Sequence, residues 1–242
     1  MQKGMIDQAC EAFRRLLEEQ LARQERMEQG NAAVKFTAEK PVTIGVIGGD
    51  GIGPIIMRQA RRVMEALLCD ELTAGSIVLK EITGLTLERR LQEQKAIPED
   101  VLAEIKTCDV LLKGPTTTPK GGGLESANVA MRRELDLYAN VRPVCIPEQG
   151  IDWVFFRENT EGEYVLGSRG IEIPGKLAMD FKVTTDCGTR RIARAALEYA
   201  AQNGKTRLAV VTKANIMKKT DGKFSALCHE VAKEYPGIAV ED

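Results

Sequence analysis

From Pro41 onward, short apolar runs alternate with stretches of helical periodicity, and this alternation constrains the fold more than any other feature of the sequence. Apolar runs of four to eight residues are typical of buried strands, and apolar residues repeating every three or four positions are typical of helices. We expect strands at 42–47, 76–82 and 109–113 and helices at 54–68, 85–94 and 98–107. Strands joined by helical crossovers form sheets with helices packed on them. The pattern therefore predicts an α/β fold with an open sheet.

The second half of the chain continues the pattern with one interruption. Between residues 164 and 182 the signal weakens to two short strand-like pieces divided by glycines and a proline, which predicts a hairpin arm. The other expected elements are helices at 128–135, 186–203 and 224–234 and strands at 137–144, 152–157, 207–212 and 238–241. Trp153, Phe155 and Phe156 are expected to lie in the core.

A separate amphipathic helix is predicted at 6–27, where apolar residues recur every three or four positions between charges. Turn-forming residues follow it up to Lys40 and show no periodicity. We therefore expect three parts: an N-terminal helix with its linker at 1–40, a larger α/β domain at 41–137, and a smaller domain with the arm at 138–242.

Charge and cysteine content exclude several classes of protein. The net charge is −1 and basic residues form no tract, so nucleic acid is not an expected partner. The six cysteines lie dozens of residues apart and there is one histidine, His229, so cysteine or histidine metal sites are not expected. Any metal would need carboxylates. No apolar run approaches the roughly 18 residues of a membrane span, and we expect a cytoplasmic location.

A glycine-rich loop, Gly48 to Gly53, joins the first predicted strand to a helix that opens with Pro54. Glycines at this place can admit a pyrophosphate, but the dinucleotide spacing fails because Pro54 takes the third glycine position. Asp50 also places a carboxylate where a phosphate would lie. Turn geometry alone explains the glycines, so a nucleotide-binding module remains a weak alternative.

Polar residues follow the third predicted strand. The loop after Lys113 is rich in threonine, proline and glycine, and it leads to Ser126 and Asn128 in the first turn of a predicted helix, where hydroxyl, amide and free N–H groups favour an anion. Arg132, Arg142 and Arg157 follow. If they converge, their guanidinium groups suit a polycarboxylate. The alternative, that each arginine makes an exposed ion pair, remains open from spacing alone.

Tyr164 and Lys213 are candidates for an acid and a base, although most tyrosines and lysines in such positions are structural. Acting near neutral pH would require neighbouring cations or burial to lower their pKa from about 10. His229 is expected to be a surface residue.

Taken together, six motifs resemble the isocitrate and isopropylmalate dehydrogenase family in its order, over residues 42 to 242. They are the glycine loop 48–54, Lys113-Gly114-Pro115, Ser126-x-Asn128-x-x-x-Arg132, the segment 136–143, the segment from Arg157 to Tyr164, and Lys213-x-Asn215. The resemblance implies the family fold, of which this chain would be the N-terminal portion. It also implies oxidative decarboxylation of a 2-hydroxy acid that carries a 3-carboxylate.

The resemblance also implies roles for the candidate residues. Arg132, Arg142 and Arg157 would hold substrate carboxylates, and Ser126 and Asn128 would contact the distal carboxylate and the nicotinamide end. The remaining implied roles are Tyr164 as the acid that reprotonates the enol carbon, Lys213 as the base supplied by the partner of a homodimer, Asn215 in substrate binding, and Thr117, Thr118 and Asn128 in cofactor binding. The pair Ser126 and Asn128 favours isocitrate over isopropylmalate.

The family's cofactors are NAD or NADP and a divalent metal, Mg²⁺ or Mn²⁺. The resemblance places the aspartates that hold the metal beyond residue 242, so no metal ligand is expected within the chain and we expect it to be inactive alone. Leu124 and Glu125 precede Ser126 where many family members have arginine, which alters the charge there. The alternatives are a regulatory, tricarboxylate-binding subunit and a 3-isopropylmalate dehydrogenase.

Overall fold

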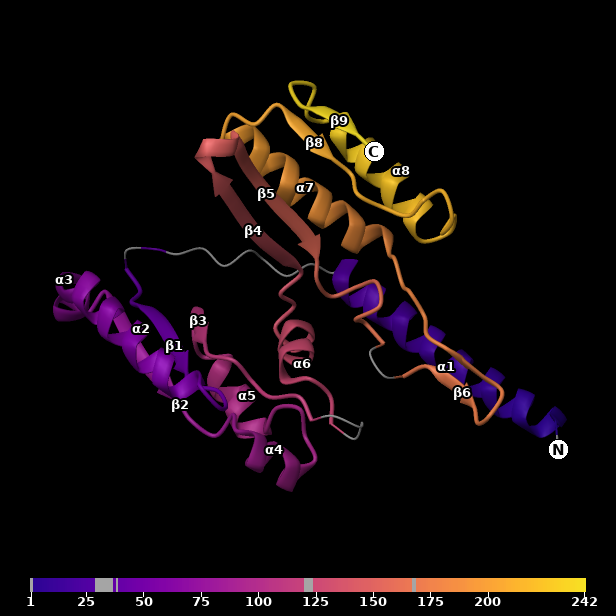
Figure 1. The fold of residues 1–242 in the computed structure, drawn as a ribbon, viewed down its shortest axis with the longest axis horizontal. Helices are drawn as coiled ribbons and strands as arrows, with labels where there is room; N and C mark the ends of the chain where they lie inside the picture. The colour runs from indigo at the N-terminus through magenta and orange to yellow at the C-terminus, as the bar shows by residue number, and fades with distance from the viewer. Residues whose placement is uncertain (1, 29–36, 38, 120–123, 167–168) are drawn as a thin grey trace. The chain divides into compact units, whose positions relative to one another are not determined.

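The structure is a computed structural model that describes residues 2–28, 37, 39–119, 124–166 and 169–242. Its contacts group the chain into two compact units. Unit 1 comprises residues 1–31 and 136–242, and unit 2 comprises residues 32–135. Figure 1 shows the elements of both units. The sequence alone predicts an N-terminal helix apart from both domains, whereas in the structure this helix groups with residues 136–242.

Unit 2 is a small parallel α/β assembly, as the alternation predicts. Its three-stranded sheet has the order β2-β1-β3, and both strand pairs are parallel. Its elements are β1 (Val42–Ile47), α2 (Gly53–Leu67), α3 (Cys69–Ala74), β2 (Ile77–Ile82), α4 (Leu87–Glu93), α5 (Glu99–Ile105), β3 (Val110–Lys113) and α6 (Ala127–Glu134). The short helix α3 is absent from the prediction.

The core of unit 2 lies between its sheet and helices α5 and α6. Ile47 and Ile82 from the sheet pack with Val101 and Ile105 of α5 and with Met131 of α6. Gly45 is part of β1, where a Cβ atom would come within 2.7 Å of Leu111 and 2.8 Å of Ile82, so a larger residue would displace this core. The polar loops of unit 2 therefore extend from elements that are packed in this core.

Unit 1 is built around an antiparallel hairpin and two helices. Its elements are α1 (Gln2–Glu28), β4 (Ala139–Ile146), η1 (Pro147–Gln149), β5 (Ile151–Glu158), β6 (Ile171–Ile173), β7 (Leu177–Met179), α7 (Asp186–Gln202), β8 (Arg207–Ala209), α8 (Asp221–Ala232) and β9 (Ala239–Glu241). Strands β6 and β7 pair antiparallel, which confirms the predicted hairpin arm. Strands β8 and β9 pair in parallel, and their side chains pack with those of α7 and α8.

The two faces of the β4–β5 hairpin differ. Phe156 packs against Tyr199 of α7, with ring centroids 5.3 Å apart. Trp153 and Phe155 alternate with Phe156 along the strand, and more than half of each side chain remains exposed. The expectation that all three aromatic residues lie in the core is therefore wrong for Trp153 and Phe155, because among the described residues it is the opposite face of the hairpin that packs against a helix.

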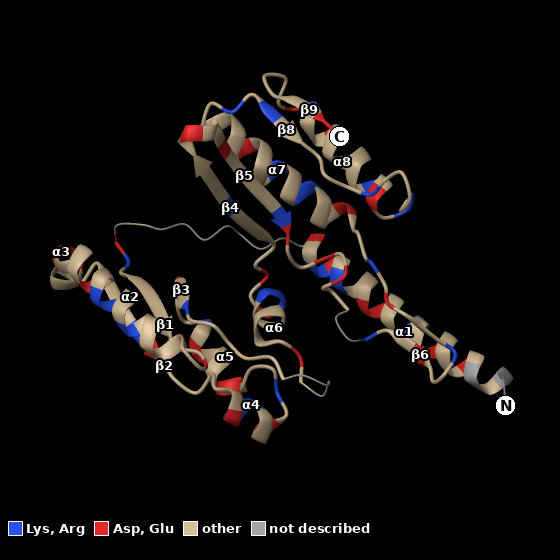
Figure 2. Cartoon of the chain, viewed as in Figure 1, with Lys and Arg blue, Asp and Glu red and all other residues tan. Residues whose placement is uncertain are grey.

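Helix α1 lies along the arm of unit 1 (Figure 1). Leu16 is buried with Val165 and Leu166, and the rings of Phe13 and Phe181 are 5.2 Å apart. Acidic and basic residues are interspersed along the helix (Figure 2). Within the described part of the chain, no helix is both long and apolar enough to cross a membrane.

Candidate active site

The glycine loop of unit 2 has a structural role that its sequence pattern leaves open. Gly49 has φ of +76°, and a Cβ atom there would lie 2.1 Å from the carbonyl oxygen of Pro115. The Asp50 N–H donates to the same carbonyl, at 2.7 Å. The loop therefore packs directly on the Gly114-Pro115 turn that follows β3, which only a residue without a side chain permits at position 49.

Asp50 and Arg90 fix the polar loop after β3 from two sides. The carboxylate of Asp50 accepts hydrogen bonds from the N–H groups of Leu87 and Thr117, each at 2.8 Å. Arg90 is fully buried. It donates to the carbonyl oxygens of Ala96 and Thr117, each at 2.8 Å, and of Glu125 at 3.1 Å. Thr117 is thus held through both its N–H and its carbonyl, and its hydroxyl lies on the surface together with that of Thr118.

The start of α6 carries the polar residues predicted to meet substrate. Ser126 is the N-cap residue, but its hydroxyl makes no capping hydrogen bond. The Thr116 hydroxyl donates to Asn128 Oδ1 at 3.2 Å. Glu125, the departure from the family pattern, forms a bidentate pair with Arg133 at 2.6 and 2.9 Å. The negative charge of Glu125 is therefore paired with the positive charge of Arg133.

Lys113 belongs to the same cationic region as Arg132. Burial lowers the pKa of Lys113, the charge of Asp50 opposes this, and the charges of Arg132 and Arg90 add to the lowering. These mutual effects place Lys113, Arg132 and Arg90 within electrostatic reach of one another. Sequence reasoning names Lys113 only as part of a motif, and in the structure its ammonium donates to the carbonyl of Gly114 at 2.5 Å.

In unit 1, Arg142 and Arg157 lie on one face of the β4–β5 hairpin. Arg157 is paired with Asn140 across the strands, and Arg142 is two residues further along β4, so all three share a face. Arg142 donates to Asn140 Oδ1 at 2.7 Å, and Arg157 donates to Asn159 Oδ1 at 2.9 Å. The amides orient the two guanidinium groups, and both arginines are exposed, as binding of a carboxylate requires.

Tyr164 lies beside Arg157. The guanidinium carbon of Arg157 is 5.4 Å from the centroid of the Tyr164 ring, which is a cation–π distance. Tyr164 is about 38% exposed, so part of the residue is accessible to solvent. The structure thus brings the arginine that is predicted to bind a carboxylate next to the predicted proton donor.

A buried polar network surrounds the residues that directly follow Arg157. Glu158 accepts from the N–H of Thr160 at 2.8 Å and from that of Glu161 at 2.5 Å, and burial raises its pKa. Arg191 of α7 lies 3.7 Å from Glu158 and forms a bidentate pair with Asp136. The network has no sequence motif that predicts it, because its members come from three separate stretches of the chain.

Lys213 and Asn215 lie on the exposed loop between β8 and α8. The N–H of Lys213 donates to Asp221 at 2.7 Å, and Asp221 also pairs with Lys182 at 2.5 Å. Burial pushes the pKa of Asp221 upward, but the hydrogen bonds from Lys182 and from the Lys213 N–H hold it below its ordinary value. Asp221 therefore fixes the backbone beside Lys213.

Two further features bear on ligands. Among the described residues, no three carboxylate, histidine or cysteine side chains are grouped as a metal ion would need.

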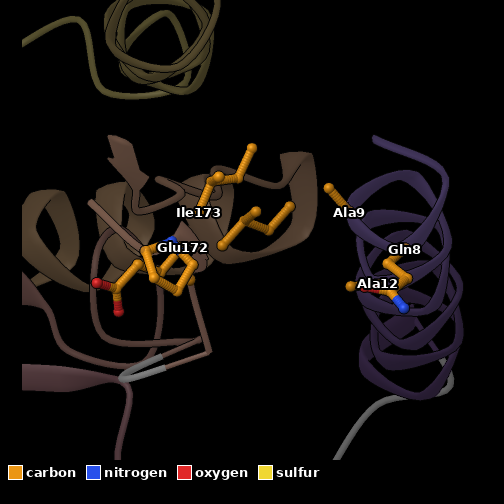
Figure 3. Close-up of a pocket in the computed structure, with 8 residues that line it drawn as sticks. Gln8, Ala9, Ala12, Glu172 and Ile173 are labelled. Atoms are coloured by element: carbon orange, nitrogen blue, oxygen red, sulfur yellow. The ribbon is translucent and has the colours of Figure 1, made fainter. Parts of the chain in front are cut away.

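A shallow cavity of about 260 Å³ lies between α1 and the arm, lined by Gln8, Ala9, Ala12 and residues 170–174. Figure 3 shows the carboxylate of Glu172 turned away from the helix. This cavity contains none of the predicted site residues.

The structure therefore describes the candidate site as two groups, each within its own unit. Unit 2 holds Thr117, Thr118, Ser126, Asn128 and Arg132, and unit 1 holds Arg142, Arg157, Tyr164, Lys213 and Asn215. Arg157 and Tyr164 are in contact, and Arg142 shares their face of the hairpin.

Comparison with known proteins agrees with the motifs. The family model described as isocitrate/isopropylmalate dehydrogenase matches residues 43–242. NAD isocitrate dehydrogenase regulatory subunit 2 of Arabidopsis thaliana mitochondria is 39% identical over 209 residues, which cover 84% of this chain and 53% of that protein. Catalytic subunit 5 from the same organism is 37% identical over 211 residues, with the same coverage. The chain thus spans about half the length of these curated relatives.

Solved structures give the same result. The isocitrate dehydrogenase of Methylococcus capsulatus has a TM-score of 0.72 and 35% identity, and the match covers 83% of this chain and 60% of that one. A β-decarboxylating dehydrogenase of Thermococcus kodakarensis has a TM-score of 0.64 and 33% identity, over 83% of this chain and 57% of that one. The α/β prediction is confirmed, and the chain belongs to the isocitrate/isopropylmalate dehydrogenase family.

Proposed function

We propose that the chain binds isocitrate through its arginines and carries the substrate-binding part of an NAD(P)-dependent oxidative decarboxylation to 2-oxoglutarate. The observation that carries the proposal is the shared hairpin face of Arg142 and Arg157, with Tyr164 stacked beside Arg157. Two guanidinium groups oriented by asparagine amides suit a ligand with several carboxylates. The family supports the chemistry, since its members include isocitrate dehydrogenases.

Each residue has a role in this proposal. Arg142 and Arg157 bind carboxylates of the substrate, and Arg132 with Ser126 and Asn128 binds the distal carboxylate. Tyr164 donates a proton to the carbon that loses carbon dioxide, and Lys213 of a second copy accepts the proton of the substrate hydroxyl. A second copy is required because the resemblance assigns this base to the partner of a homodimer.

The nicotinamide cofactor supplies the hydride acceptor when bound. The loop from Thr116 to Thr118 fits the cofactor role, because Asp50 and Arg90 fix its backbone while the hydroxyls of Thr117 and Thr118 remain exposed. The divalent metal does not fit in the same way, since the described residues include no carboxylate group suited to it. Following the resemblance, which assigns the metal ligands to residues outside this sequence, we also propose that the 242-residue chain binds isocitrate but does not turn it over.

Titration calorimetry with isocitrate tests the proposal. We expect saturable binding that Arg142→Ala weakens by about tenfold to a hundredfold, since a hydrogen bond to a charged group contributes about 1.5–3 kcal/mol. The matched control is Arg207→Ala, which removes an exposed arginine paired with Glu241 on another sheet of unit 1. Absence of binding, or equal loss in both variants, contradicts the proposal. A comparison with 3-isopropylmalate distinguishes the two substrates of the family.

A regulatory, tricarboxylate-binding subunit is the second candidate. It is favoured by similarity to three Arabidopsis thaliana proteins named as regulatory subunits, which are 38–39% identical to this chain. A site formed by arginines binds without metal, so isocitrate affinity should be equal with and without Mn²⁺. Addition of the chain to a purified catalytic subunit should then change the isocitrate dependence of that subunit's rate. An unchanged rate curve argues against the regulatory function.

A further inference from the structure

Helix α1 lies outside the residues that match the family, yet it contacts the family's substrate motif. The match begins at residue 43, and α1 ends at Glu28. The helix packs in unit 1 beside the segment from Thr160 to Leu166, which begins three residues after Arg157 and contains Tyr164. An element added to the family fold is therefore attached to the segment that carries two predicted functional residues.

Arg23 makes the polar part of this attachment. Its guanidinium donates to Glu161 Oε1 at 3.2 Å and to Thr160 Oγ1 at 3.3 Å. Both acceptor residues are buried, and the Arg23 side chain is only 15% exposed. A charge-assisted pair at this depth is screened much less than a surface ion pair.

Two carboxylates, those of Glu158 and Glu161, lie on either side of Thr160, and a cation at position 23 offsets their repulsion. Glu158 and Glu161 are close enough that the charge of Glu161 contributes to the raised pKa of Glu158. Among the described residues, Arg191 of α7 approaches Glu158 and Arg23 approaches Glu161. Glu161 otherwise accepts from neutral donors, the N–H of Thr185 at 2.9 Å and its hydroxyl at 2.5 Å. Without Arg23, the two carboxylates would lie near each other with one cation.

Apolar contacts with α1 hold the C-terminal end of the same segment. Leu16 is buried against Val165 and Leu166, directly after Tyr164. Nearer its N-terminus the helix lines the cavity shown in Figure 3 with Ala9 and Ala12. Leu16 and Arg23 thus contact the residues on both sides of Tyr164, which are Val165 on one side and Glu161 on the other.

We propose that Arg23 is a positioning residue that, acting through Thr160 and Glu161 and assisted by Leu16, fixes the segment 158–166 and thereby places Tyr164 beside Arg157. Arg23 contacts neither predicted catalytic residue directly. The effect of this placement on ligand binding rests on the proposed function, whereas the placement itself does not.

Hydrogen–deuterium exchange of the full chain without ligand tests the placement. In Arg23→Met, amides of 158–166 should exchange at least about threefold faster, while those of 192–202 in α7 remain unchanged. Arg23→Lys should restore part of the protection because it keeps the charge near Glu161. The control is Arg26→Met, which removes an exposed arginine of the same helix. Unchanged exchange at 158–166 in Arg23→Met overturns the proposal, and so does a uniform increase over all of unit 1.

Isocitrate affinity of the same variants tests the consequence. We expect Arg23→Met to weaken binding by roughly threefold to tenfold at a temperature where the variant is fully folded, and Arg26→Met to leave it unchanged. Equal affinity despite faster exchange at 158–166 overturns the link between the helix and the site. If the unmodified chain binds no isocitrate, the proposed function fails, and the exchange experiment still decides whether Arg23 positions the segment.

Discussion

Arg90 shows how a single residue with no place in any motif can support a site. It lies fully buried and donates to three backbone carbonyls, two of which belong to Thr117 and Glu125 at either end of the polar loop. Buried carbonyls that lose their donor each cost about 1–3 kcal/mol, because water cannot replace it. The loop is held by a side chain that lies 27 residues before Thr117 and 35 before Glu125.

Arg90→Met should therefore lower the free energy of unfolding by about 3–5 kcal/mol, since it leaves these acceptors without the guanidinium. Denaturant titration followed by circular dichroism measures the change. Arg58→Met serves as the control because Arg58 is exposed on α2, and it should change stability by less than about 0.5 kcal/mol. Similar losses in both variants would show that the buried hydrogen bonds of Arg90 contribute little.

Asp221 gives a pH-dependent prediction. Its pKa in the folded chain lies below the ordinary value of 3.8, so its ionised form stabilises the fold. This contribution is fully present above pH 3.8 and is lost as the pH falls through the folded pKa. The deficit of Asp221→Asn relative to the unmodified chain should be largest at neutral pH, about 1–3 kcal/mol, and should shrink below about pH 4.

Denaturant midpoints measured between neutral and acidic pH test this. Asp180→Asn, which changes an exposed carboxylate of the same unit, should show no such trend. A deficit of Asp221→Asn that stays constant with pH would show that the Lys182 pair and the Lys213 N–H do not depend on ionised Asp221.

At the scale of elements, the β4–β5 hairpin separates two aromatic environments. Phe156 faces α7 and contacts Tyr199, whereas Trp153 lies on the opposite, exposed face. Phe156→Ala should lower the free energy of unfolding by about 2–3 kcal/mol, because it removes packed apolar surface. Trp153→Ala removes a larger side chain but should cost less than about 1 kcal/mol. Chemical denaturation of both variants measures this difference, and a larger loss at Trp153 would place its face in a packed interior.

Individual elements could be predicted well wherever the apolar pattern is local. The strand 42–47 is predicted with the bounds of β1, and the expected helices at 6–27, 98–107 and 186–203 correspond to α1, α5 and α7. The start of α8 at Asp221, three residues before the predicted one, could not be read from periodicity. Asp221 is buried there by its contacts with Lys182 and Lys213, which are tertiary contacts.

The sequence predicts a site residue only where that residue belongs to a motif. The contact of Arg157 with Tyr164 joins two residues of one motif, whereas the support of that motif comes from Arg191 and Arg23 in distant helices. The sequence likewise cannot show which face of the hairpin is covered, because α7 begins about thirty residues after β5 ends. The assigned roles of the site residues remain predictions that binding experiments have to test.

At the scale of the whole molecule, the two units contain separate cores. Each core includes or contacts one cysteine, whose reactivity therefore measures whether that core is packed. Cys108 packs beside the core of unit 2, and Cys228 is buried in that of unit 1, where burial raises its pKa to about 12. Cys10, Cys69 and Cys145 are exposed. Because the thiolate is the reactive form, exposure and pKa together determine which cysteines react.

Alkylation of the native chain at mildly alkaline pH, followed by peptide mass spectrometry, should therefore modify Cys10, Cys69 and Cys145 first and leave Cys228 unmodified. In denaturant all six should react at similar rates, which is the control for intrinsic reactivity. Because Cys228 and Cys108 lie in different units, titration with denaturant separates the two cores: if the units unfold independently, the two thiols become reactive at different denaturant concentrations. Rapid modification of native Cys228 would contradict the packed core between α7, α8 and the β8–β9 pair, since Cys228 is buried in that core.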